Sequence, residues 1–169
     1  MPERQTLERA REDAREGRSP STQAGEFVRE EMQHVRQGKH GVRSTKQAIA
    51  IGLSKARRAG IELRPPRRGS ARTRKQAQRD YSKGQSTPKR KPSARRSRAT
   101  RRALKREGRA GASRRSLSQQ ARTSARQRSA ADRYRSARRA VRTKGRQGRV
   151  QAARKAARTR RAHSSRSRA

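Results

Sequence analysis

The sequence predicts a small all-α fold, a helical hairpin of two or at most three short helices, followed by a long, largely disordered, Arg-rich C-terminal tail. Three observations lead to this prediction. Apolar residues recur at helical spacing only before residue 65. Leu, Ile, Val and Phe together number 14 of 169 residues, and so small a share combined with high charge is typical of disorder. The net charge is +40, and the residues after 31 carry it.

The N-terminal segment, residues 1–18, has the pattern of a short charged helix. Leu7, Ala10 and Ala14 form a thin apolar stripe, and Gly17 is suited to ending the helix. Because the stripe is narrow and the other positions are charged, we expect a solvated helical arm.

Residues 19–64 carry clear folding signals. Ser19 followed by Pro20 suits an N-cap and a first helical position, and the helix should stop at Gly38. Glu26 and Glu30 fall on the polar face, which we expect to be solvated, whereas Glu31 borders the apolar stripe and needs a basic partner from the next helix. The predicted core residues of this helix are Phe27, Val28, Met32 and Val35.

A second helix should begin at Ser44, where Gln47 completes a capping box, and end at Gly60. Ile49 and Leu53 face the first helix, whereas Ile51 falls on the opposite face. About eight buried side chains at roughly 2 kcal/mol each do not clearly exceed the ordering cost of a hairpin this small. Ile51 is therefore a candidate contact to a third helix or to a second protomer.

The remaining chain divides into a Pro-containing basic linker, residues 65–92, and a tail rich in Arg, Ala and Ser, residues 93–169. Beyond Arg64 the large aliphatic residues are Leu104, Leu117, Val141 and Val150. These are too few to offset an ordering cost of about 1–2 kcal/mol per residue. We expect the tail to be disordered when free and to form helices once phosphates neutralise it.

The distribution of charge identifies a class of partner. Residues 1–31 hold eight acids and six bases, whereas residues 32–169 hold 46 bases and four acids. Such a polycation requires polyanions, and nucleic acids release condensed counterions when their phosphates are neutralised. Aromatic residues make up 2% of the chain, which argues against modules that stack on single-stranded bases. Double-stranded DNA is therefore the expected partner, with RNA as the alternative.

Candidate phosphate contacts follow from the positions of the bases. Around the expected turn they would lie beside the N-terminus of the second helix, whose free N–H groups suit phosphate. The hairpin set comprises Lys39, His40, Arg43, Lys46, Lys55, Arg57 and Arg58. The linker and tail set comprises Arg67, Arg68, Lys89, Arg90, Lys91, Arg95, Arg96, Arg101, Arg102, Arg138, Arg139, Arg154, Lys155, Arg160 and Arg161.

Other functional classes receive little support. The chain has no Cys, and His34, His40 and His163 lack the spacing of a metal motif, so we expect no metal, no cofactor and no enzymatic activity. There is no Gly-rich phosphate loop, and neither a signal peptide nor an apolar run long enough to span a membrane is recognisable. We expect a cytoplasmic protein that has no small-molecule substrate and does not bind membranes.

Residues 43–60, Arg-Ser-Thr-Lys-Gln-Ala-Ile-Ala-Ile-Gly-Leu-Ser-Lys-Ala-Arg-Arg-Ala-Gly, carry a family resemblance. With Gly25-Glu26-Phe27 and residues 38–41, Gly-Lys-His-Gly, they resemble small basic bacterial proteins that are catalogued as a domain of unknown function. The resemblance covers about residues 19–64. Some members of that family are labelled DNA-binding proteins, so the resemblance implies DNA binding without implying an activity. The tail is similar in composition alone to linker-histone tails.

Three functions are consistent with these features. The first is a nucleoid-associated, histone-like protein that binds DNA without sequence preference and neutralises, bridges or compacts it. The second is an RNA-associated or ribosome-associated basic protein. The third is a protein-interaction or regulatory module, contacting its partner through Phe27, Ile51 and the acidic N-terminal face, which the tail tethers to nucleic acid.

Overall fold

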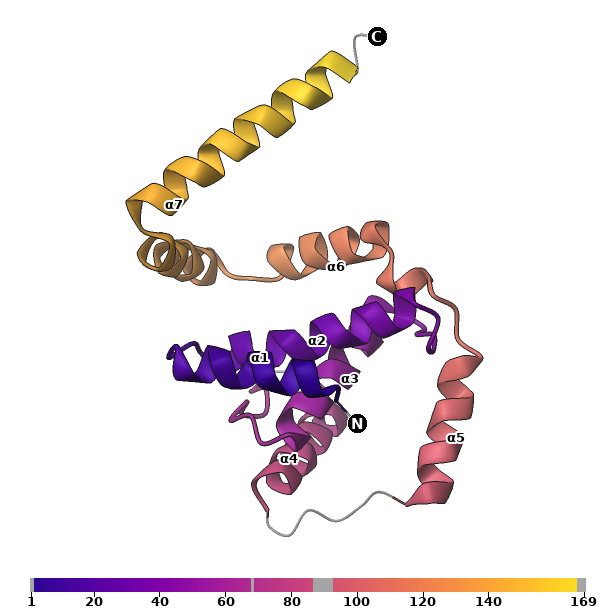
Figure 1. The fold of residues 1–169 in the computed structure, drawn as a ribbon. Coiled ribbons are helices and arrows are strands. Elements are labelled where there is room, and N and C mark those ends of the chain that lie inside the picture. The colour runs from indigo at the N-terminus through magenta and orange to yellow at the C-terminus, as the bar shows by residue number, and fades with distance from the viewer. Residues whose placement is uncertain (1, 68, 87–92, 167–169) are drawn as a thin grey trace. The chain divides into compact units, whose positions relative to one another are not determined.

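The computed structural model describes residues 2–67, 69–86 and 93–166, and every regular element in these ranges is helical (Figure 1). The chain divides into two compact units, residues 1–120 and 121–169. The elements are α1 (Arg4–Arg15), α2 (Pro20–Arg36), α3 (Thr45–Arg58), α4 (Ala71–Gln85), α5 (Ala94–Lys105), the short 3₁₀-helix η1 (Ala110–Ala112), α6 (Arg114–Arg126) and α7 (Ala130–Arg166).

The prediction of a long disordered tail is wrong, because helices α4 to α7 continue through the linker and tail as far as Arg166. The physical reason is local. Ala, Arg, Lys and Gln are strong helix formers, and serines supply caps. Ser70 Oγ accepts a hydrogen bond from the Thr73 N–H at 3.1 Å, and Ser129 Oγ accepts one from the Asp132 N–H at 3.1 Å. The scarcity of large aliphatic residues limits the core, but it does not prevent these helices.

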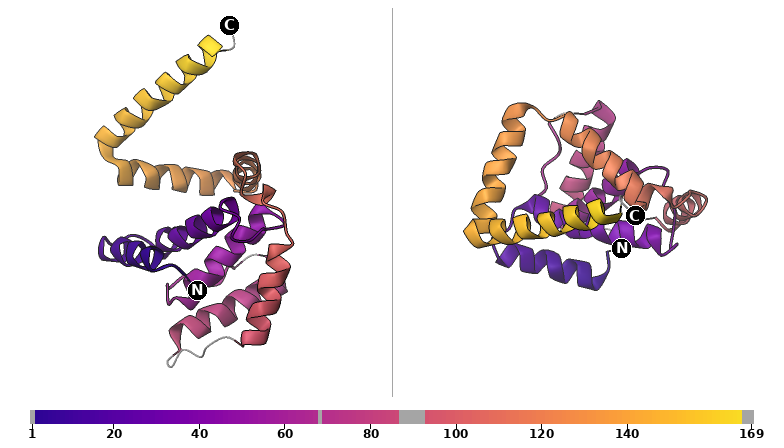
Figure 2. Two further views of the ribbon diagram at one scale, coloured as in Figure 1. Left: turned by 45° about the vertical axis from the view of Figure 1, so that its right-hand side comes forward. Right: turned by 90° about the horizontal axis from the view of Figure 1, so that it is seen from above.

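Helices α2 and α3 pack together as the central pair of the first unit, and α1 and α4 lie against them (Figures 1 and 2). Gly52 on α3 makes this contact close, because a Cβ atom there would lie 2.7 Å from Val28 Cα on α2. Phe27 and Val35 are fully buried and Met32 is 7% exposed, whereas Val28, Ile49 and Leu53 are partly buried at the edges of the core.

Helix α1 is packed against α2 rather than being a solvated arm. Thr6 and Ala10 are buried, and Leu7 joins the cluster that contains Ala24, Phe27 and Ala56. The stripe is thin, but Leu7 and Ala10 are enough to join α1 to the core.

The segment from residue 104 to residue 117 covers the turn between α2 and α3. The Gly41 N–H donates to the Leu104 carbonyl at 2.9 Å, and the Val42 N–H donates to the Gly108 carbonyl at 2.8 Å. Ala112 is fully buried in one cluster with Met32, Val35, Val42 and Ala48, against which Ile51 and Leu117 also pack. The additional support that the small hairpin needs therefore comes from the chain's own C-terminal part, and Ile51 contributes to that packing.

The second unit consists of the end of α6 and of α7. Helix α7 is interrupted at Gly145, whose backbone has φ 60° and ψ −174°. Tyr134, Val141 and Val150 are its exposed large apolar residues. Over the part of the chain that the structure describes, no helix combines the length and the apolar character needed to cross a membrane.

Candidate nucleic-acid interface

The bases at the hairpin turn mostly contact acids of the same chain. Lys39 Nζ lies 2.8 Å from Glu3 Oε1, and Arg43 Nε lies 3.4 Å from Glu107 Oε1. Hydrogen bonds from Lys39 and His34 lower the pKa of Glu3 to about 2. Lys46 is exposed, and among the described residues no acid forms an ion pair with it.

The bases at the C-terminal end of α3 also contact groups of the same chain. Lys55 Nζ lies 2.7 Å from Glu31 Oε2 and 3.1 Å from Glu30 Oε1, and both carboxylates are almost fully buried. Burial alone would lower the pKa of Lys55, but its contact with Glu31 and the charges of both acids raise it. Arg57 is 8% exposed, its Nε donates to the Leu63 carbonyl at 3.1 Å, and burial lowers its pKa.

Arg58 completes a buried polar contact between α3 and α4. Its Nε lies 2.8 Å from Asp80 Oδ1, and Asp80 is 1% exposed. Ser54 Oγ donates to the same carboxylate at 2.7 Å and Gln76 Nε2 at 3.1 Å. Burial alone would raise the pKa of Asp80, but these three donors lower it.

The start of α3 is covered by η1 and the residues beside it. Thr45 is buried, and its hydroxyl donates to the Gly111 carbonyl at 2.6 Å. Ser44 Oγ accepts from the Gln47 N–H at 3.3 Å, as the predicted capping box requires, but Gln47 Oε1 accepts from the Arg43 N–H at 2.8 Å. These contacts fix the first turn of α3, and the Gln47 N–H is satisfied by Ser44 within the chain.

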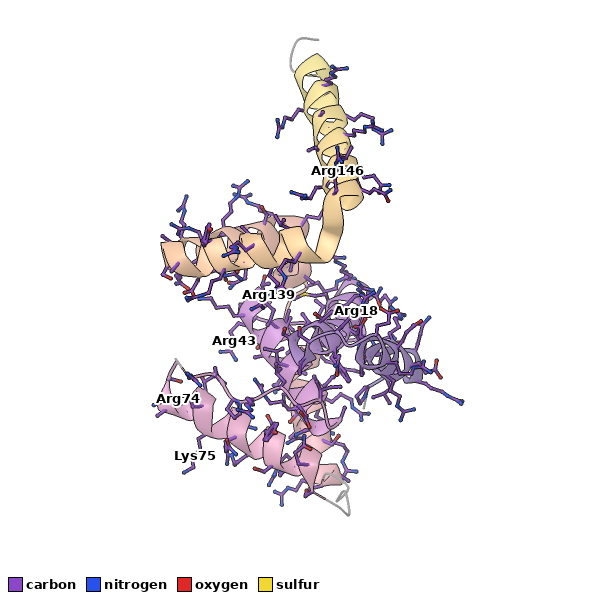
Figure 3. The ribbon with its side chains drawn as sticks, turned by 90° about the vertical axis from the view of Figure 1, so that its left-hand side faces the viewer. Arg18, Arg43, Arg74, Lys75, Arg139 and Arg146 are labelled. Atoms are coloured by element: carbon purple, nitrogen blue, oxygen red, sulfur yellow. The ribbon has the colours of Figure 1, made fainter. Side chains whose placement is uncertain are left out.

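The bases of α5, α6 and α7 are arranged differently. Neither α5 nor α6 buries any residue, and α5 contains six bases and no acid. In the sequence of α7 the one acid is Asp132, whose Oδ1 lies 2.6 Å from Arg135 Nη2. Figure 3 shows the long side chains standing out around both halves of α7, with Arg139 and Arg146 labelled. Seven further predicted contacts on these helices are exposed: Arg95, Arg96, Arg101, Arg102, Arg138, Arg154 and Lys155.

The remaining predicted contacts are spread over the chain. Arg160 and Arg161 are exposed near the end of α7, and Arg67 is exposed before α4. Arg74 and Lys75 on α4 also project outward, and they were not among the predicted contacts (Figure 3). The helix-forming composition of residues 71–85 was the sequence signal that could have placed both residues on a helix. Arg68, Lys89, Arg90 and Lys91 lie outside the described residues.

A cluster of histidine and acidic side chains was not predicted from the sequence. Glu31 and His34 lie on α2, and the turn after α2 brings His40 back beside them. One nitrogen or oxygen atom of each side chain lies within 4.8 Å of the other two. The sequence contains no metal-binding motif with this spacing. His40 reaches Glu31 and His34 through the turn after α2, and residues 104–117 pack against that turn.

Comparison with known proteins gives one partial match. No curated protein and no solved structure shows significant similarity to the chain. Residues 19–68, which contain α2, α3 and the turn between them, are similar to a family of unknown function, DUF6496.

Proposed function

We propose that this chain binds double-stranded DNA without sequence preference, as a cytoplasmic, nucleoid-associated, histone-like protein that neutralises the duplex and bridges or compacts it. The observation that carries the proposal is that the bases divide into two sets. Those of the hairpin are mostly paired with acids of the chain, whereas the bases of α5, α6 and α7 whose side chains the structure describes are exposed and have few acids near them in sequence.

The numbers of charges support this division. Residues 93–169 contain 28 of the 52 Lys and Arg residues and two acids, Glu107 and Asp132. Both acids contact arginines. Each base that neutralises a phosphate releases a counterion, so a surface of this kind gains free energy on any nucleic-acid backbone. Arginine also binds phosphate with two parallel N–H donors.

The aromatic residues favour a duplex over a single strand. Phe27 is fully buried and Tyr81 is partly buried, so neither forms an open platform for a base. Tyr134 is 64% exposed, but Arg138 lies over its ring at 5.9 Å. Without stacking platforms, binding has to come from phosphate contacts, and an exposed α-helix is of a size that the major groove admits.

The experiment that tests the proposal measures affinity for duplex DNA over a salt series, using full-length variants. Truncation at residue 92 is unsuitable, because it would also remove Ala112 and Leu117 from the hairpin core. A four-site glutamine variant of α5 should weaken binding and reduce the salt slope by up to about 3–4, since each lost phosphate contact removes roughly 0.9. The substitutions are Arg95→Gln, Arg96→Gln, Arg101→Gln and Arg102→Gln.

A matched control removes the same number of charges from α1, where bases alternate with acids. If α5 contacts phosphate, the α1 variant should keep a salt slope within about one unit of the wild type. Equal losses in the two variants would contradict an interface on α5. Tighter binding to structured RNA than to matched duplex DNA at physiological salt would contradict the DNA assignment. The control substitutions are Arg4→Gln, Arg9→Gln, Arg11→Gln and Arg15→Gln.

A further inference from the structure

We propose that Glu31, His34 and His40 form a binding site for one divalent transition-metal ion of the zinc class. The three side chains come from the second half of α2 and from the turn that follows it. Their candidate ligand atoms lie within 4.8 Å of one another. The site is independent of the proposed DNA interface, because no base of α5, α6 or α7 belongs to it.

The hydrogen bonds of the two imidazoles determine which ring nitrogens are available to a metal. His40 Nδ1 lies 3.1 Å from the Gly41 carbonyl, which can only accept, so in the neutral tautomer that makes this hydrogen bond Nδ1 carries the proton. His34 Nε2 lies 2.8 Å from the carboxylate oxygen Glu3 Oε1, so that nitrogen is also a donor. In the neutral rings, His40 Nε2 and His34 Nδ1 therefore present lone pairs. Carboxylates and backbone carbonyls commonly orient metal-binding histidines in this way.

Both lone pairs face acidic oxygens rather than donors. His40 Nε2 lies 3.1 Å from Glu31 Oε1, and His34 Nδ1 lies 4.0 Å from Glu30 Oε1. Two acceptors that face each other repel unless a cation lies between them. The Glu31 side chain is 1% exposed, and among the described residues its Oε1 accepts no hydrogen bond. Its Oε2 contacts Lys55, so Oε1 is the oxygen left to bind a second cation.

The surrounding charge also favours a cation. Glu3, Glu30 and Glu31 contribute three negative charges, and Lys39 and Lys55 contribute two positive charges. The cluster therefore has one excess negative charge when both rings are neutral, although the whole chain carries +40. A divalent ion would supply the missing positive charge at one point. The edge-to-face rings of His34 and His40, with centroids 6.1 Å apart, could share it.

The ligand types indicate which ions would bind. Two imidazoles and one carboxylate suit Zn²⁺, Ni²⁺ or Cu²⁺, whereas Mg²⁺ and Ca²⁺ prefer oxygen ligands alone. With bonds near 2.0–2.1 Å, neighbouring ligand atoms of a tetrahedral zinc site lie about 3.3 Å apart. The pair His40 Nε2 and Glu31 Oε1 already meets this spacing at 3.1 Å. The imidazoles are 12% and 14% exposed, so an ion can reach them from solvent.

The test titrates the full chain with Zn²⁺ by calorimetry, after high salt has removed bound nucleic acid and a chelator has removed metal. We expect saturable binding of one ion per chain, and the absorption of tetrahedrally coordinated Co²⁺ when that ion replaces zinc. Mg²⁺ should give no comparable signal. Absence of a saturable one-to-one site would overturn the proposal and would leave protons on the imidazoles as the cations of the cluster.

Variants assign the site to particular residues. His34→Gln and His40→Gln should each weaken Zn²⁺ binding by at least about tenfold, and Glu3→Gln should weaken it by about 10–100-fold through the orientation of His34. His163→Gln alters the one other histidine of the chain and should leave affinity unchanged. Circular dichroism shows whether each variant keeps its helices. Equal loss in His163→Gln, or full affinity in a helical His34→Gln/His40→Gln double variant, would overturn the assignment.

Discussion

Lys55 Nζ on α3 lies 2.7 Å from Glu31 Oε2 on α2, and this ion pair joins the two central helices inside the first unit. The Glu31 side chain is 1% exposed and that of Lys55 is 22% exposed. A second contact of the same ammonium, 3.1 Å from Glu30 Oε1, makes Lys55 the basic partner of two buried acids. Removing it leaves two carboxylates without their main counter-charge.

We therefore expect Lys55→Met to lower the free energy of unfolding by about 3 kcal/mol, because breaking a buried pair from one side leaves an uncompensated charge. Urea unfolding followed by circular dichroism, with a chelator present, measures the change. Lys46→Met is the matched control on the exposed face of the same helix and should stay within about 0.5 kcal/mol of the wild type. Equal effects at the two positions would show that the pair does not stabilise the fold.

The neighbouring acids Glu31 and Glu30 show how well the helical periodicity of the sequence predicts the burial of a side chain. Glu31 borders the apolar stripe in that pattern, and the prediction that it needs a basic partner from the next helix is confirmed. The same pattern predicts a solvated Glu30, and this is wrong, since Glu30 is 2% exposed. The segment that leads into α1 covers it, and the Glu3 N–H donates to Glu30 Oε2 at 3.0 Å. Periodicity within one helix does not report what another segment places on its polar face.

The tail shows a different limit of sequence reasoning. Counting large aliphatic residues correctly indicates that α5 and α6 have no core of their own, since neither buries a residue. The count does not detect helices that are maintained by propensity and caps. The count of large aliphatic residues also leaves out small residues that pack in the core. Ala112 and Gly111 allow the chain to approach Val42 and Ser44 closely. That approach shapes the turn that contains His40, so the histidine cluster could not be predicted from spacing.

Gly52 provides a test of the close contact between α2 and α3. A Cβ at this position would lie 2.7 Å from Val28 Cα and 2.9 Å from Val28 N, and backbone atoms cannot rotate away. Gly52→Ala should therefore force the helices apart and destabilise the protein by about 1–3 kcal/mol. Thermal or urea unfolding measures this change.

Gly25 on α2 is the control for that substitution. Among the described residues, no atom outside the neighbouring helix backbone lies within 4 Å of its Cβ position. Gly25→Ala should therefore stabilise the protein by about 0.5–1 kcal/mol, since alanine is the better helix former. If Gly52→Ala were also stabilising, the close packing of α2 on α3 would be disproved.

Asp80 should make the stability of the first unit depend on acidity. Its pKa in the folded protein is below its ordinary value of 3.8, because Ser54, Gln76 and Arg58 donate to the charged form. The stabilisation that this carboxylate contributes is thus complete well above pH 3.8 and is lost as the pH falls through the lower folded-state pKa.

Asp80→Asn should destabilise the protein by about 2 kcal/mol at neutral pH, because hydrogen bonds to a charged group are replaced by bonds to a neutral one. Below pH 3.8 this difference from the wild type should shrink. Urea unfolding of both proteins across that pH range provides the comparison. A difference that stays constant with pH would show that the carboxylate is not held in its charged form.

Two truncations test whether the C-terminal part stabilises the hairpin. A chain that ends at Gln120 keeps the whole first unit, so its free energy of unfolding should be close to that of the same unit in the full protein. A chain that ends at residue 92 loses Ala112 and Leu117 from the core and the carbonyl partner of the Thr45 hydroxyl. The shorter chain should be less stable by about 3 kcal/mol or more, from lost apolar burial and lost hydrogen bonds. Equal stability of the two chains would mean that residues 104–117 rest on the hairpin without stabilising it.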